Sequence, residues 1–191
     1  IGIATSVAPD DATPGAFYAH VNHRGQFYDI AKDMAESDYE IFAGGKLRGH
    51  APQGQPDVRT VLADAGYSVV DGPAKWNEKK HGDKVVLLNA PYHLDHIGYT
   101  IDSIQGNLTL PFITKACIEH LEKVSPKRFF LMVEGGLIDH ALEKGHKFAE
   151  VTIEGNKYNL SRDFEDVIKD LTGNGIQVGK FLVGSSLKPY V

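Results

Sequence analysis

The sequence predicts a layered α/β protein with a mostly parallel sheet and flanking helices. Short apolar segments alternate with segments of helical periodicity, which is the pattern of such folds. The run Phe129–Val133 is apolar throughout, as in a buried strand of a parallel sheet. Two strand-like segments end in glycine pairs, Gly44-Gly45 and Gly135-Gly136. Because ligands collect where parallel strands end, we expect the functional residues to follow the strands.

The composition of the chain limits the kinds of molecule that we expect it to bind. The 191 residues are 42% hydrophobic and 24% charged, as in an ordinary globular domain. The net charge of −5 gives no reason to expect nucleic acid or an anionic membrane as a partner. No segment approaches the roughly 20 apolar residues of a membrane-spanning helix. The single cysteine, Cys117, cannot form an internal disulfide.

The first strand is predicted over Ile1–Val7, and a helix follows it. This strand is short, apolar and β-branched, as in the core of a sheet. A strand this hydrophobic with no strand before it implies that its partner strands are missing from these residues, or that it pairs with a second chain, as in a homodimer. Thr13 is a good N-cap and Pro14 a good first helical residue. Asp11 and Thr13 flank this helix start, where side-chain oxygens turn back to cap the backbone or turn outward to bind a cation. Both roles are open on residue types alone.

The middle of the chain continues the alternation of strands and helices. Apolar residues at helical spacing predict helices, β-branched runs predict strands, and a segment rich in Gly and Pro predicts a loop. The expected elements are helix 26–37, strand 39–45, loop 46–56, helix 57–65, strand 67–70, strand 84–88 and helix 111–124.

Two acids follow the apolar run that ends at Val133. Glu134 comes directly after it, and Asp139 lies five residues further on, beyond the glycine pair. Two carboxylates at one strand end suit a hard cation or a pair of metals. Alternatively, Asp139 is a solvated acid in the first turn of a helix, where it complements the helix dipole.

A histidine cluster suggests a different zinc chemistry. His93, Asp95 and His96 match the second half of the metallo-β-lactamase zinc signature, in which histidines and an aspartate converge on zinc. The first histidine of that signature would fall on Pro91, and no companion motif follows. The alternatives are a lactamase-like zinc hydrolase and an exposed loop with clustered histidines.

Three segments resemble the alkaline phosphatase family. FFLMVEGGLIDHA, residues 129–141, resembles its metal-binding strand and turn. DATPGAFYAHVNHR, residues 11–24, resembles the segment that binds magnesium and phosphate, and LTLP, residues 108–111, resembles the start of the helix before the metal strand. The resemblance is colinear over 1–142. We therefore expect an alkaline phosphatase-like α/β region at 1–142. In 143–191 we expect a hairpin near 154–157, a helix 161–171 and a strand 176–183, all of the same compact domain.

The resemblance implies the following site. Asp11, Thr13 and Glu134 would bind Mg²⁺, whose preferred ligands are hard oxygens, and Asp139 would bind Zn²⁺. Arg24 would clamp the substrate, because a guanidinium fork holds two phosphoryl oxygens at once. The implied substrate is a phosphate monoester, and the implied location is periplasmic or extracellular.

The sequence also departs from the family pattern. The zinc histidine expected four residues after Asp139 is Glu143, with His146 three residues later. The family's serine nucleophile, an early metal aspartate, a later Asp-His pair and a final zinc histidine have no counterpart in these residues. We therefore expect a fragment of an alkaline phosphatase, or a domain derived from one, with little or no activity of its own. A noncatalytic phosphate- or metal-binding domain is the alternative.

Overall fold

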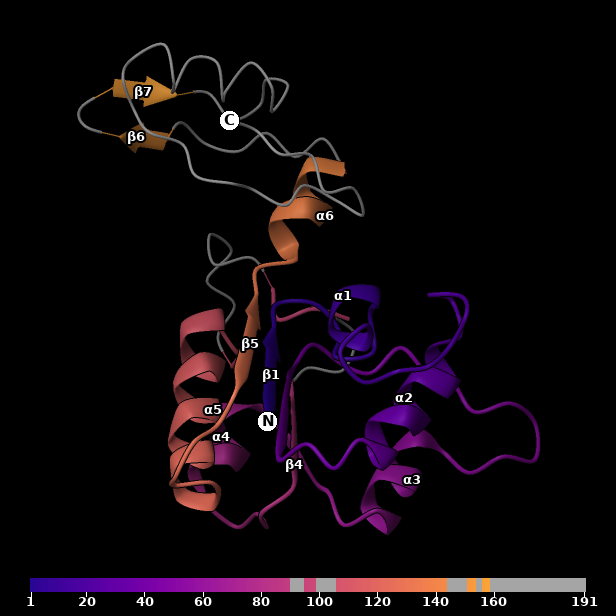
Figure 1. The fold of residues 1–191 in the computed structure, drawn as a ribbon. Coiled ribbons are helices and arrows are strands. Elements are labelled where there is room, and N and C mark those ends of the chain that lie inside the picture. Colours follow the sequence, from indigo (N-terminus) through magenta and orange to yellow (C-terminus); the bar gives the residue numbers. More distant parts are fainter. Residues whose placement is uncertain (90–94, 99–105, 144–150, 154–155, 159–191) are drawn as a thin grey trace. The chain divides into compact units, whose positions relative to one another are not determined.

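The computed structural model describes residues 1–89, 95–98, 106–143, 151–153 and 156–158. The chain forms two compact units, 1–137 and 138–191. The first unit contains a five-stranded sheet of order β3-β4-β2-β1-β5, in which every described pairing is parallel (Figure 1). This confirms the predicted α/β fold. The strands are β1 (Gly2–Thr5), β2 (Ile41–Gly44), β3 (Ser68–Asp71), β4 (Val85–Leu88) and β5 (Leu131–Glu134).

Helices cover both faces of this sheet. Successive side chains of a strand point to opposite faces, so Ile3 packs in one core cluster and Ala4 in the other. One cluster lies under α2 and α3 and the other under α4 and α5, on opposite sides of the sheet in Figure 1. The helices of this unit are α1 (Ala12–Gly15), α2 (Phe27–Glu36), α3 (Val58–Asp64), α4 (Gly72–Asn77) and α5 (Leu110–Val124).

Side-chain caps explain where three of these helices begin. Asp57 accepts a hydrogen bond from the Arg59 amide at the start of α3, and the Thr109 hydroxyl accepts one from Phe112 at the start of α5. The prediction that Thr13 caps the first helix is wrong, because Asp11 is the N-cap of α1. The Asp11 carboxylate accepts from the Ala12 amide at 2.8 Å. Thr13 lies inside α1 and is exposed.

The first strand lies in the core of the sheet, as expected, but the expectation that its partner strands are missing from these residues is wrong. β1 lies between β2 and β5 and is fully buried. Within the described residues the two edge strands are β3 and β5, and β5 pairs with β1 alone. The prediction that β5 is a buried strand is therefore only half correct: Met132 is buried, whereas Val133 is 46% exposed. The apolar character of β1 reflects two neighbours inside the chain, contributed by residues about 40 and 130 positions away.

The second unit contains a short hairpin. β6 (Val151–Ile153) and β7 (Asn156–Tyr158) pair antiparallel, which confirms the hairpin expected near 154–157. The helix expected over 161–171 and the strand over 176–183 lie outside the described residues. α6 (Leu137–Glu143) contains the boundary between the units, and the division after Leu142 stays a prediction. In the part of the chain that the structure describes, no helix has the length and apolar character needed to cross a bilayer.

A ring cluster packs at the end of the sheet where the strands begin. Trp76 of α4 stacks on His81 with ring centroids 4.4 Å apart, and His120 of α5 lies 5.5 Å from His81. His120 is 3% exposed, and its Nε2 is 2.9 Å from the carbonyl oxygen of Asp83. Burial lowers the pKa of His120, and the neighbouring His81 and Lys123 act in the same direction, against the opposing effect of Asp83.

We predict that the contribution of His120 to stability falls as the pH drops below about 6.5, the ordinary pKa of histidine, because the unfolded chain then binds a proton that folded His120 resists. Above that pH His120 contributes no pH dependence. Urea unfolding between about pH 7.5 and pH 5.5, followed by the fluorescence of the single tryptophan Trp76, measures this slope. His120→Gln should flatten the slope, and His20→Gln, at an exposed position, should leave it unchanged. An equal slope in all three proteins would contradict the prediction.

Candidate functional site

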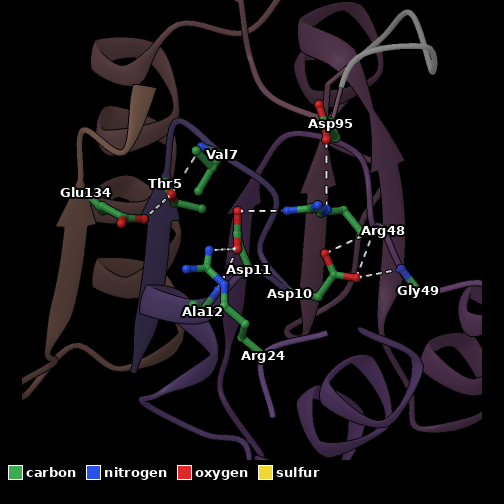
Figure 2. A network of polar contacts seen from close by, with 10 residues as sticks. All are labelled: Thr5, Val7, Asp10, Asp11, Ala12, Arg24, Arg48, Gly49, Asp95 and Glu134. Atoms are coloured by element: carbon green, nitrogen blue, oxygen red, sulfur yellow. Dashed lines mark hydrogen bonds and ion pairs between the residues drawn. The ribbon is translucent and has the colours of Figure 1, made fainter. Parts of the chain in front are cut away.

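The carboxyl ends of β1, β2 and β5 carry the polar residues of the candidate site (Figure 2). The segment after β1 contains Asp10 and Asp11, the segment after β2 contains Arg48, and β5 ends at Glu134. Because these three strands are neighbours in a parallel sheet, their carboxyl ends lie side by side. The site therefore lies where the sequence predicted a ligand to bind.

Hydrogen bonds join the ends of β1 and β5. The Thr5 hydroxyl donates to the Glu134 carboxylate at 2.5 Å and accepts from the Val7 amide at 3.2 Å. Ser6 is 4% exposed, and its hydroxyl accepts from the Leu137 amide at 3.0 Å. Both hydroxyls thus have structural partners. The Glu134 carboxylate is held in one orientation beside β1.

Asp11 is a buried carboxylate between two arginines. Its side chain is 4% exposed. Oδ1 accepts from Nη2 of Arg24 at 3.0 Å as well as from the Ala12 amide, and Oδ2 accepts from Nη1 of Arg48 at 3.1 Å. Charge-assisted bonds to two guanidinium groups offset the cost of burying the carboxylate. Arg24 itself is 59% exposed. The structure therefore brings together two of the predicted residues, Asp11 and Arg24.

Asp10 joins the segment after β1 to the segment after β2. It is fully buried, and its carboxylate accepts from the Arg48 amide at 2.8 and 3.0 Å and from the Gly49 amide at 2.8 Å. Burial raises the pKa of Asp10 to about 6, against the lowering effect of these hydrogen bonds. The Asp10 side chain consequently sets the path of the backbone at Arg48.

Arg48 is not among the residues that the sequence indicates for the site, because it lies in the segment 46–56, which the sequence predicts as a loop. The guanidinium group lies over the Phe27 ring, 4.1 Å from its centroid, and its Nε is 3.8 Å from Oδ2 of Asp95. The available signal was the glycine pair at the end of β2. That pair marks the carboxyl edge of a strand, and Arg48 follows it by three residues.

The residues assigned to magnesium fit that ion by type. Asp11, Thr13 and Glu134 offer hard oxygen donors; Asp11 and Thr13 follow β1, and Glu134 ends the neighbouring β5. Asp11 is bonded to arginines, Glu134 to Thr5, and Thr13 is exposed on α1. Within the described ranges, no three or more His, Cys, Asp or Glu residues form a group that could hold a metal ion. The magnesium assignment stays a prediction.

The zinc assignment also stays a prediction. Asp139 lies in the first turn of α6, where it is half-buried. It belongs to the second unit. The side chain of Glu143 and all of His146 lie outside what the structure describes.

The histidine cluster of the lactamase-like alternative has other contacts. Asp95 lies beside Arg48, and Nδ1 of His96 accepts from the Gly98 amide at 2.9 Å. His93 lies outside the described residues. The described contacts of Asp95 and His96 are thus to an arginine and to the backbone.

Comparisons with known proteins agree on one family. The tissue-nonspecific alkaline phosphatase of Felis catus is 26% identical over 226 residues, which cover 95% of this chain and 43% of the relative. The repressible alkaline phosphatase of Saccharomyces cerevisiae is 29% identical over 76% of this chain and 30% of its own length. No family model matches the sequence.

Solved structures agree with these relatives. An alkaline phosphatase from the Antarctic bacterium TAB5 superposes with a TM-score of 0.62 and 30% identity, covering 76% of this chain and 42% of that one. The Thermus thermophilus alkaline phosphatase gives a TM-score of 0.61 at 25% identity, over 73% of this chain and 30% of that one. The chain thus spans less than half the length of these proteins. In sequence and in fold, the chain resembles alkaline phosphatases over part of their length.

Proposed function

We propose that this chain supplies the phosphate-binding and magnesium-binding part of a metal-dependent phosphate monoester hydrolase. The observation that carries the proposal is the pairing of Arg24 with Asp11. An exposed guanidinium group is anchored to a buried carboxylate at the carboxyl edge of a parallel sheet. The kinship with alkaline phosphatases supports this choice of chemistry.

The anchoring of Arg24 suits it to hold a phosphoryl group. Nη2 of Arg24 binds Asp11, and a guanidinium carries five N–H donors in a rigid fork. The donors directed away from Asp11 can bind two phosphoryl oxygens. Asp11 keeps the exposed side chain in place, so less conformational entropy is lost when phosphate binds.

Asp11, Thr13 and Glu134 are the residues that would hold Mg²⁺, which supplies charge neutralisation and an activated water when bound. Glu134 is already oriented by Thr5. Asp139 would be a zinc ligand. The proposal carries with it a periplasmic or extracellular location. It also assigns the nucleophile to residues outside these 191, so that the isolated chain binds phosphate without turnover.

We predict that Arg24→Ala lowers the affinity for inorganic phosphate on the order of tenfold or more, the size expected when charge-assisted hydrogen bonds are lost. Calorimetric titration of the 191-residue chain with phosphate, with and without Mg²⁺, measures it. Arg59→Ala is the matched control, because Arg59 forms an ion pair with Asp71 at the end of β3, at the other edge of the sheet from β5.

Unchanged phosphate affinity in Arg24→Ala would overturn the phosphate-binding role. A parallel assay with an aryl phosphate, in Mg²⁺ and Zn²⁺, tests the expected absence of turnover. Metal-dependent hydrolysis that disappears in Arg24→Ala would show that the chain is a complete catalyst, contrary to the proposal.

A further inference from the structure

We propose that Arg48 is a positioning residue for the phosphate site: it holds the Asp11 carboxylate so that Asp11 can orient Arg24. The inference rests on the proposed function, because it assigns a role to Arg48 in phosphate binding. The chain of contacts runs from Arg48 to Oδ2 of Asp11 and from Oδ1 of Asp11 to Arg24 (Figure 2).

Arg48 is well suited to fix another side chain because it is itself fixed at several points. Its amide donates to the buried Asp10 carboxylate, which sets its backbone. Its guanidinium group packs on the Phe27 ring and faces Asp95 on a second side. Cation–π contact and ion pairing restrict a side chain that would otherwise sample many rotamers.

The exposure of the two arginines separates their roles. The Arg24 side chain is 59% exposed, whereas that of Arg48 is 32% exposed. Arg48 contacts two carboxylates and an aromatic ring, so its charge is already matched within the protein. Arg24 has one described ion pair, with Asp11, and extends toward solvent. Arg24 is therefore placed to meet a phosphoryl group, and Arg48 acts on it through Asp11.

Removing Arg48 takes away the charged partner on one oxygen of Asp11. The carboxylate, which the protein buries almost completely, can then rotate or recruit Arg24 more closely. Either change alters the direction in which the exposed end of Arg24 points. Phosphate binding should weaken although every phosphate-contacting group is still present.

A double-mutant cycle tests whether Arg48 acts on Arg24 through Asp11. We expect Arg48→Ala to weaken binding of inorganic phosphate by about threefold to tenfold, as for one charged hydrogen bond, and Arg48→Lys to restore part of the loss. Arg59→Ala, which breaks the separate pair with Asp71, should bind phosphate as the unchanged chain does. In an Asp11→Asn background, Arg48→Ala should lower the phosphate affinity no further, because the charged link between the two arginines is already removed.

The outcomes separate the inference from the proposed function. Wild-type affinity in Arg48→Ala, or a full loss that persists in the Asp11→Asn background, would overturn the positioning role while leaving Arg24 in place. Absence of phosphate binding, or binding that ignores Arg24→Ala, would refute the proposed function and this inference with it. Circular dichroism verifies folding. If Arg48→Ala does not fold, Arg48→Lys and Phe27→Leu, which removes the ring beneath the guanidinium, carry the same test.

Discussion

Replacing Phe42 with alanine is expected to lower the free energy of unfolding by about 3 to 5 kcal/mol. Phe42 lies in the central part of the sheet on β2 and is completely buried. Its ring contacts those of Tyr18, Tyr39 and Tyr67, with centroids 5.2, 5.6 and 6.1 Å away. Truncation therefore opens a cavity among side chains anchored on different elements. A domain that is stable by about 5 to 15 kcal/mol would lose a large share of its stability.

Urea unfolding followed by Trp76 fluorescence measures this loss. Phe17→Ala is the matched control, since Phe17 is 44% exposed and stacks on Phe130 with centroids 6.2 Å apart. Because a surface ring pair contributes little, the control should lose about 1 kcal/mol or less. Similar losses in the two variants would show that the aromatic cluster around Phe42 is not the centre of the core.

Replacing Gly45 with alanine is the second change expected to have a large effect. A Cβ atom there would lie 2.5 Å from the carbonyl oxygen of Asp95 and 2.6 Å from its carbonyl carbon. These are backbone atoms, so the clash cannot be relieved by turning a side chain. We expect a loss of about 1 to 3 kcal/mol, as for overpacking elsewhere. Phosphate affinity should also fall, because Asp95 and Arg48 are displaced together.

Gly82→Ala provides the comparison for Gly45→Ala. A Cβ atom at Gly82 would lie 3.5 Å from the Ser68 hydroxyl oxygen, an ordinary van der Waals distance. This variant should unfold at nearly the wild-type urea concentration and bind phosphate normally. If Gly45→Ala behaved in the same way, the close approach between the segment after β2 and the Asp95 segment would not matter to the site.

Local patterns predicted most of the elements, because each depends on neighbours in the sequence. The spacing of Ile30, Ala31 and Met34 predicted α2, and all three are buried. The short helix α4 was missed. It starts with Gly72 and Pro73, residues typical of turns, and the burial of Trp76 against the core accompanies its formation.

The errors arose where the partner of an element is distant in the sequence. The sequence implies that the partners of β1 are missing because no strand precedes it, yet β1 pairs with residues near 41 and near 131. β5 was expected inside the sheet because it is apolar, yet only one of its sides is paired among the described strands. An apolar run shows that a strand belongs in a sheet but not its place in the strand order.

Some residues of the candidate site are likewise indicated by local motifs, and others only by contacts between distant segments. The motifs alone pointed to Asp11, Thr13, Arg24, Glu134 and Asp139, through a resemblance that the comparisons support at the level of the family. Asp10 and Arg48 emerged only from the structure. Asp10 binds backbone amides 38 and 39 positions away, and Arg48 reaches Asp11 across 37 positions.

The sequence by itself determined the fold class, the main helices and strands, and the chemical types of the site residues, because periodicity and motifs are local properties. Tertiary structure decided which strand lies at the edge, that Asp11 rather than Thr13 caps α1, and that two arginines share one buried carboxylate. The physical reason is that strand order and charge pairing depend on which distant segments pack side by side. Those contacts form only when the chain closes its loops and buries its apolar faces.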